Sequence, residues 1–278
     1  MESETILRMT AFFGVFIVMA IWEFIANRRD LTQSKGIRWF NNLGILIIDI
    51  VVQRFTMGAA AVAVAIYAQQ NGWGLFNYLD WPFWVEIILV FLVLDFMIYL
   101  QHVMSHALPI FWRLHRVHHA DLDIDCTTAL RFHPLEIILS MVFKVALVVA
   151  LGADAFAVIL FEAVLNGSAI FNHANVRMPK FMDSFMRMFV VTPDMHRVHH
   201  STKVKEANSN YGFFLSAWDR VCGTYIPQPS EGHLEMDIGL KEYREQKKLN
   251  LLNIILLPFW SKIGGYSIQP DKAEGSES

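Results

Sequence analysis

H-R-V-H-H occurs twice in this chain, as His115-Arg-Val-His118-His119 and as His196-Arg-Val-His199-His200. Residues i, i+3 and i+4 of a helix project to the same side, so each copy would place three imidazoles on one face. Histidine makes up 11 of the 278 residues. At such a frequency an HxxHH motif arises by chance only about 0.02 times in a chain of this length. Two copies therefore indicate metal binding rather than chance surface clusters, because imidazole is the commonest protein ligand of iron, zinc and copper.

The composition is that of an integral membrane protein. Hydrophobic residues make up 54% of the chain, charged residues only 18%, and the mean hydropathy is +0.36. A soluble domain has about 25% charged residues. The net charge of −3 provides no basic surface for nucleic acid. Cys126 and Cys222 form no CxxC motif, which argues against a thiolate metal site.

Five apolar stretches are long enough to be membrane helices: residues 6–26, 43–68, 83–101, 135–151 and 155–171. The last two are joined only by Gly152-Ala-Asp154, so we expect a helical hairpin that crosses the membrane and returns. The stretch 249–260 is too short to span and is expected to lie at the interface. The predicted fold class is an all-α integral membrane protein, in which four to five membrane helices are capped by a cytosolic, histidine-rich di-metal domain.

Counting the spans predicts that the histidines meet on one side of the membrane. Basic residues between the first and second stretches, at Arg28, Arg29, Lys35 and Arg38, mark the cytoplasmic side. If the amino terminus lies outside, the third span ends in the cytoplasm and the hairpin returns there. The histidines on that face are His102, His106, His115, His118, His119, His173, His196, His199 and His200. One ion takes about four to six ligands, so this number implies two metal ions.

Polar residues near these histidines are candidates to orient the imidazole rings. Asp95 and Tyr99 lie on one helical stripe with His102 and His106, although a polar contact between helices is the alternative for Asp95. The other candidates are His133, Asp194, Asn210 and Asp219. The acidic run Asp121, Asp123 and Asp125 is expected to be solvated or to cap a helix.

The second span contains Asp49, Gln53 and Arg54. Polar groups at this depth should face the protein interior and pair with each other. We therefore expect a structural aspartate–arginine pair between helices. A role toward a substrate or a proton is the alternative.

The order of motifs resembles that of the fatty acid hydroxylase/sterol desaturase superfamily of membrane di-iron oxygenases. The resemblance rests on HxxxH at His102/His106 and on the two HxxHH copies, and it extends over residues 89–225. It implies N-terminal membrane helices in 1–82, a catalytic domain in 83–228, and a C-terminal interfacial helix and tail in 229–278. It also implies that the eight motif histidines, with His173, hold two irons. The family often has a further HxxxH, where this chain has only His173 followed by Arg177.

The resemblance further implies O₂ as co-substrate and electrons from a separate reductase chain, because no cytochrome or flavin domain is fused here. The predicted function is hydroxylation or desaturation of a membrane lipid such as an acyl chain, a sterol or an alkyl-glycerol lipid. Imidazole ligands alone would also suit zinc or copper. The alternatives are thus a zinc-dependent membrane hydrolase or lyase, and a non-catalytic metal-binding protein. No retrieval signal ends the chain, which favours a bacterial inner membrane; the oligomeric state is left open.

Overall fold

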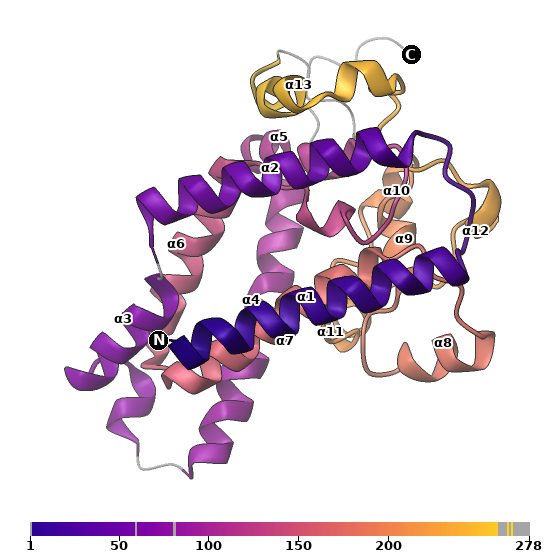
Figure 1. Cartoon of the computed structure of the whole chain (residues 1–278). Helices are drawn as coiled ribbons and strands as arrows, with labels where there is room; N and C mark the ends of the chain where they lie inside the picture. The colour runs from indigo at the N-terminus through magenta and orange to yellow at the C-terminus, as the bar shows by residue number, and fades with distance from the viewer. Residues whose placement is uncertain (1, 59, 80–81, 261–265, 267, 269–278) are drawn as a thin grey trace.

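The computed structural model of this chain describes residues 2–58, 60–79, 82–260, 266 and 268, and helices joined by loops make up this part (Figure 1). The long helices are α1 (Glu2–Ile25), α2 (Lys35–Thr56), α3 (Ala60–Gln70), α4 (Phe83–Ala107), α6 (Pro134–Leu151) and α7 (Ala155–His173). The shorter ones are α5 (Pro109–His119), α8 (Lys180–Met186), α9 (Pro193–His199), α10 (Val204–Ala207), α11 (Ala217–Val221), α12 (Gly232–Glu235) and α13 (Leu251–Leu256). Four 3₁₀ turns occur at Leu75–Tyr78, Thr128–Leu130, Gln246–Leu249 and Leu257–Phe259 in the described part. Residues 269–278 of the expected tail lie outside it.

Five segments are long and apolar enough to cross a membrane: Ile6–Ile25, Lys35–Tyr78, Phe83–Ala107, Pro134–Leu151 and Ala155–His173. The predicted all-α, multi-pass fold class is thereby confirmed. The second span differs from the expectation of one helix over 43–68, because α2 begins at Lys35 and the span is divided into α2 and α3. Gly58 adopts a φ of 57° between them, a left-handed conformation that ends an α-helix.

The long helices alternate in direction and bring several ends together. The end of α1 is bonded to the end of α7, since Arg28 N donates to Asn175 O and Arg177 N donates to Ala26 O, both at 2.8 Å. α2 starts at this end and leaves it, α4 returns, α6 leaves and α7 returns. This out-and-back threading gathers the histidine-bearing segments at one end, as the parity argument requires.

α4 is the central helix of the bundle. Its buried residues Val90, Leu94 and Ile98 pack in one cluster with Val148 of α6 and Phe161 of α7. Large apolar side chains on the outer faces of α1 and α2 remain exposed, as expected for helices that face lipid tails. The apolar core therefore fixes α4, α6 and α7, while α1 and α2 form outer walls.

The turn between α6 and α7 is as short as predicted, but the two helices diverge from it (Figure 1). Gly152 ends α6 with a φ of 66°, and Asp154 caps α7 by accepting a 2.7 Å hydrogen bond from Phe156 N. α3 packs against both helices near their joined ends. The expected hairpin is thus an open V, which leaves space between α6 and α7.

A buried ion cluster joins α2 to the loop after α5. Arg38 Nε lies 2.7 Å from Asp121 Oδ1, and its Nη1 lies 2.6 Å from Asp125 Oδ2. Burial alone would raise the pKa of the Asp121 carboxyl, but the Arg38 charge lowers it far below its usual range. The acidic run is therefore buried and not solvated as expected. Asp121 and Asp125 neutralise the buried Arg38 of α2.

Arg38→Ala is expected to lower the free energy of unfolding by about 3–5 kcal/mol, because it leaves buried carboxylates without their cation. Chemical denaturation of the full chain in detergent micelles would measure the change. Arg54→Ala is the matched control, since Arg54 is an exposed arginine of the same helix, and its effect should be within about 0.5 kcal/mol. Equal losses in the two variants would contradict the role of the cluster.

Candidate metal centre

Nine buried histidines come together in two groups. The first group is His102, His106, His115, His119 and His199, and the second is His118, His173, His196 and His200. Within each group the candidate ligand atoms all lie within 4.8 Å of one another. The structure thus brings together all nine histidines that the sequence singled out. His133 and His233 belong to neither group.

Each HRVHH copy contributes to both groups. α5 supplies His115 and His119 to the first group and His118 to the second. The second copy does the reverse: it supplies His199 to the first group and His196 and His200 to the second. On a helix, i+4 lies about 40° to one side of i and i+3 about 60° to the other. The three imidazoles therefore fan out instead of sharing one face, and each motif links the two groups.

The spacing of ring nitrogens matches that of neighbouring metal ligands. In the first group, His102 Nε2 lies 3.1 Å from His115 Nε2, and His106 Nε2 is equally close to His119 Nε2. In the second group, His173 Nε2 lies 3.0 Å from the Nε2 atoms of His118 and His196. Two ligands at right angles on a metal with bonds of about 2.1 Å are about 3.0 Å apart. The nitrogens in each group are therefore close enough to bind a common ion.

Several of these nitrogens are buried without a protein partner. His199 Nε2 and both ring nitrogens of His200 have no hydrogen-bond partner, whereas buried polar atoms are normally satisfied. Burial, and then the neighbouring imidazoles, lower the pKa values of His118, His119, His196, His199 and His200 well below the ordinary value. The rings are neutral at pH 7, so they offer the lone pairs that a metal needs. The donor set fits two transition-metal ions.

Segment 208–211 orients three rings of the first group. Each ring bonds through Nδ1 to an oxygen of this segment, which leaves Nε2 to face the centre. The pairs are His106 Nδ1 with Asn208 Oδ1 at 3.0 Å, His199 Nδ1 with Ser209 O at 2.7 Å, and His102 Nδ1 with Tyr211 O at 2.8 Å. One short loop thus fixes the tautomers of more than half of the group.

Comparison with known proteins places this site in a family. The model of the fatty acid hydroxylase family matches residues 87–224, a segment that contains all nine histidines. The chain belongs to the fatty acid hydroxylase family. This confirms the resemblance to the fatty acid hydroxylase/sterol desaturase superfamily and the predicted class of lipid-oxidising enzyme.

Curated relatives differ in how much they share with this fatty acid hydroxylase family member. An ornithine lipid hydroxylase of Rhizobium tropici is 27% identical over 80% of this chain and 67% of its own length. Alkylglycerol monooxygenases of Xenopus tropicalis and Homo sapiens are 31% and 30% identical over 53% and 58% of this chain. The match covers only 31% and 34% of those two proteins. No solved structure matches.

Glu136, in the first turn of α6, was not predicted to be part of the fatty acid hydroxylase centre. Its Oε1 lies 2.7 Å from His115 Nδ1, and a carboxylate at that nitrogen orients the ring. The available signal was its position two residues after Pro134, which places it at the histidine end of the span.

Among the described residues, none of the six predicted ring-orienting side chains hydrogen bonds to any of the nine histidine rings. Asp219 comes nearest in effect, because it accepts hydrogen bonds from Tyr211 N and Gly212 N at 2.8 and 2.9 Å and so supports the loop that holds His102. Asp95 accepts a hydrogen bond from Trp218 Nε1 at 2.8 Å. This is a polar contact between helices, the alternative that the sequence analysis gave for Asp95. Tyr99 Oη lies 2.9 Å from Thr224 Oγ1.

The other three residues support the backbone around the family motifs. Asp194 forms ion pairs with Arg28 and with Arg197, the arginine of the second HRVHH. Asn210, at a φ of 51°, donates to Met195 O at 2.9 Å and to Ile226 O at 2.8 Å. His133 caps α6 through Nδ1, which accepts from Leu135 N at 3.2 Å.

His173→Ala is expected to lower the bound metal from about two ions per chain toward one, because the second group would keep only three nitrogens. His133→Ala is the matched control, since it removes an equally buried imidazole that lies outside both groups. Elemental analysis of the purified full chain would measure both. Unchanged metal content in His173→Ala would contradict the grouping.

Proposed function

We propose that this chain is a multi-pass membrane enzyme that hydroxylates a lipid with O₂ at two irons held by the nine histidines. The observation that carries the proposal is that the first histidine group reaches the wall of a cavity inside the membrane bundle. Family membership supports the proposal, as do the curated relatives, which are named as hydroxylases and monooxygenases. Those names favour hydroxylation over desaturation.

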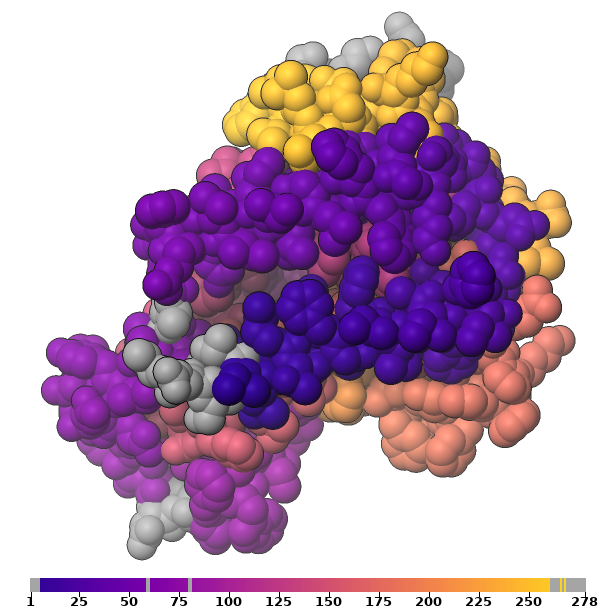
Figure 2. All heavy atoms as spheres, in the orientation of Figure 1, coloured from indigo at the N-terminus to yellow at the C-terminus, as the bar shows by residue number. Residues whose placement is uncertain are grey.

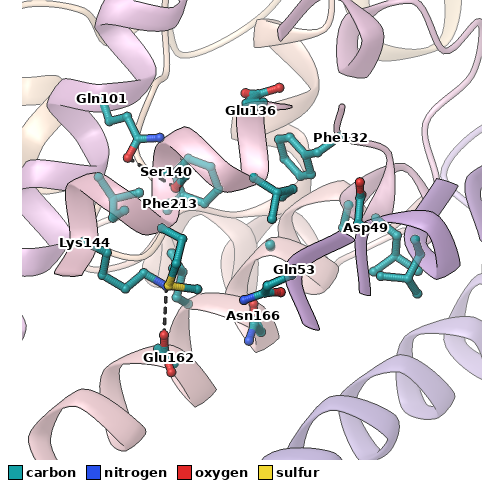
Figure 3. Close-up of a pocket in the computed structure, with 18 of the residues that line it drawn as sticks. Asp49, Gln53, Gln101, Phe132, Glu136, Ser140, Lys144, Glu162, Asn166 and Phe213 are labelled. Atoms are coloured by element: carbon teal, nitrogen blue, oxygen red, sulfur yellow. Dashed lines mark hydrogen bonds and ion pairs between the residues drawn. The ribbon is translucent and has the colours of Figure 1, made fainter. Parts of the chain in front are cut away.

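The cavity is a chamber of about 360 Å³ formed by side chains of α1, α2, α4, α6 and α7 (Figure 3). Such a volume is typical of a site for a small molecule or for part of a lipid. His102 and His115 lie in its wall, next to the aromatic side chains of Phe132 and Phe213. A lipid carbon in the chamber would therefore lie beside the first histidine group.

The chamber opens between α1 and α2. α1 packs against α7, whereas α2 packs against α6, so the two outer helices frame a gap. Phe12 of α1 and Leu46 and Ile50 of α2 line the chamber at this side. Figure 2 shows the surface hollowed between the indigo α1 and the purple α2. A membrane lipid could thus reach the chamber sideways from the bilayer.

Bound irons would supply the oxidant, derived from O₂, that replaces a C–H bond of the lipid by C–O–H. The chain's own residues orient the imidazoles through Glu136 and the loop 208–211, and they bury the nitrogens away from water. Electrons would come from a separate reductase. The basic residues Arg28, Arg29 and Lys35 near the histidine end support a cytoplasmic position for the centre, in a bacterial inner membrane.

The division into residues 1–82, 83–228 and 229–278 is part of the proposal, with the catalytic ligands in the middle segment. α1 and α2 belong to the first segment but provide two walls of the chamber. The N-terminal helices are therefore proposed to take part in substrate binding as well as in anchoring.

The test loads anaerobically prepared full-length chain with Fe(II) or with Zn(II), and then adds membrane lipid extract, a reductant and O₂. We expect a 16-dalton gain on a lipid with iron only. His118→Ala should lose this activity and His133→Ala should keep it. A 2-dalton loss would indicate desaturation. Turnover with zinc, or lipid cleavage without added oxygen, would overturn the proposal.

Leu46→Trp is expected to slow oxidation at least tenfold, because the indole would narrow the opening between α1 and α2. The neighbouring variant Ile47→Trp is the control, since Ile47 is 62% exposed on the outer face of α2 and does not line the chamber. Initial rates at several lipid concentrations would be compared. Similar rates in the two variants would argue for access from another side.

A further inference from the structure

Asp49 is a buried carboxylate that lines the chamber and has no ion-pair partner among the described residues. Its exposed fraction is 5%, and its Oδ1 has no hydrogen-bond partner. The residue lies in the middle of α2 and lines the cavity, one turn before Gln53 (Figure 3). The enzyme's metal-binding side chains do not contact it.

The arginine expected to pair with Asp49 is not there. Arg54 is exposed, and five residues along a helix turn it about 140° away from Asp49. The expected aspartate–arginine pair is therefore wrong. The lysine of the chamber, Lys144, lies 2.9 Å from Glu162, which Arg8 also contacts. Within the described residues, no cation forms an ion pair with Asp49.

An isolated carboxylate is costly inside a membrane protein, so such residues usually serve a ligand, a proton or an ion. Asp49 could reach neutrality by holding a proton or by pairing with a cation that enters the chamber. A bound proton would need no cavity beside the carboxylate. The position of Asp49 in the wall of an open chamber favours a cation brought by the ligand.

The depth of Asp49 suits a lipid headgroup. Leu251 of α13, in the stretch that the sequence predicts to lie at the interface, packs against Gly44 of α2, and Asp49 lies five residues, or about 8 Å, further along the helix. This is just below the surface on which α13 rests. Ser140 and Asn166 also line the chamber and could bond to uncharged polar groups of the same headgroup. A hydrocarbon tail would use none of these side chains.

We propose that Asp49 binds a primary ammonium group on the headgroup of the substrate lipid, so that the enzyme acts on amine-bearing lipids. The inference rests on the proposed function and narrows its substrate class. Aminoacyl lipids and phosphatidylethanolamine are two kinds of lipid that carry this group. An alkylglycerol carries no such group and would leave Asp49 unpaired.

The experiment measures lipid retention and lipid oxidation separately on the purified full chain. Native mass spectrometry would compare four probes: ornithine lipid, its N-acetylated derivative, phosphatidylethanolamine and 1-O-alkylglycerol. We expect at least tenfold stronger retention of an amine lipid than of the acetylated derivative or the alkylglycerol. Asp49→Asn should abolish this preference, and Asp49→Glu, which keeps the charge, should restore much of it. Asp237→Asn, at a carboxylate that is 72% exposed, should behave as the unaltered chain.

Each outcome decides the inference. Retention of either amine lipid, lost in Asp49→Asn and kept in Asp49→Glu, supports it and shows which amine source is preferred. Equal retention of acetylated and free amine, or an unchanged preference in Asp49→Asn, overturns it. Iron-dependent oxidation of the alkylglycerol without any preference for amine lipids would support the proposed function and would overturn the inference about Asp49. Amine-selective retention without oxidation by the iron-loaded chain would support the binding of amines at Asp49 and would overturn the proposed function.

Discussion

The structure depends on packing nine imidazoles into a protein interior, where several of their nitrogens have no hydrogen-bond partner among the described residues. Both HRVHH copies contribute to both groups, so neither group can form unless α5 and α9 are held together. The arginines of the two motifs fix each helix to its surroundings: Arg116 of α5 donates to the carbonyl of Leu257, and Arg197 of α9 pairs with Asp194 and donates to Ala174 O after α7. The metal centre and the segments around it are therefore one cooperative unit.

The same constraint reaches into the membrane helices. Arg38 of α2 lies among aspartates of the loop that follows the first HRVHH, and Glu136 of α6 holds His115. A buried ion pair is a costly way to join two elements, and its geometry must be well satisfied to form at all. The outer helix α2 thus has a defined rotation about its axis, which also determines that Asp49 faces the chamber.

The sequence predicted what spacing alone can show. Motif spacing identified eight of the nine histidines and hydropathy identified five spans. The parity of the spans added His173 and brought the histidines to one end. It did not predict Glu136 or the oxygens of 208–211, because spacing shows which side chains share a helix face but not which distant group will reach a ring. The break at Gly58 was missed for a similar reason, since hydropathy continues across a residue whose backbone turns left-handed.

The two proposals assign chemistry and substrate selection to different parts of the chain. The family match spans residues 87–224, which include every histidine of the two groups, whereas Asp49 and Leu46 lie before it on α2. The similarity to the ornithine lipid hydroxylase covers 80% of the chain, more than the family segment can supply, so it must extend into the flanking helices. A family that keeps its metal centre and varies the helices around it can change its lipid without changing its oxidant. The charge that α2 presents to the chamber is then the first feature to compare between members that act on different headgroups.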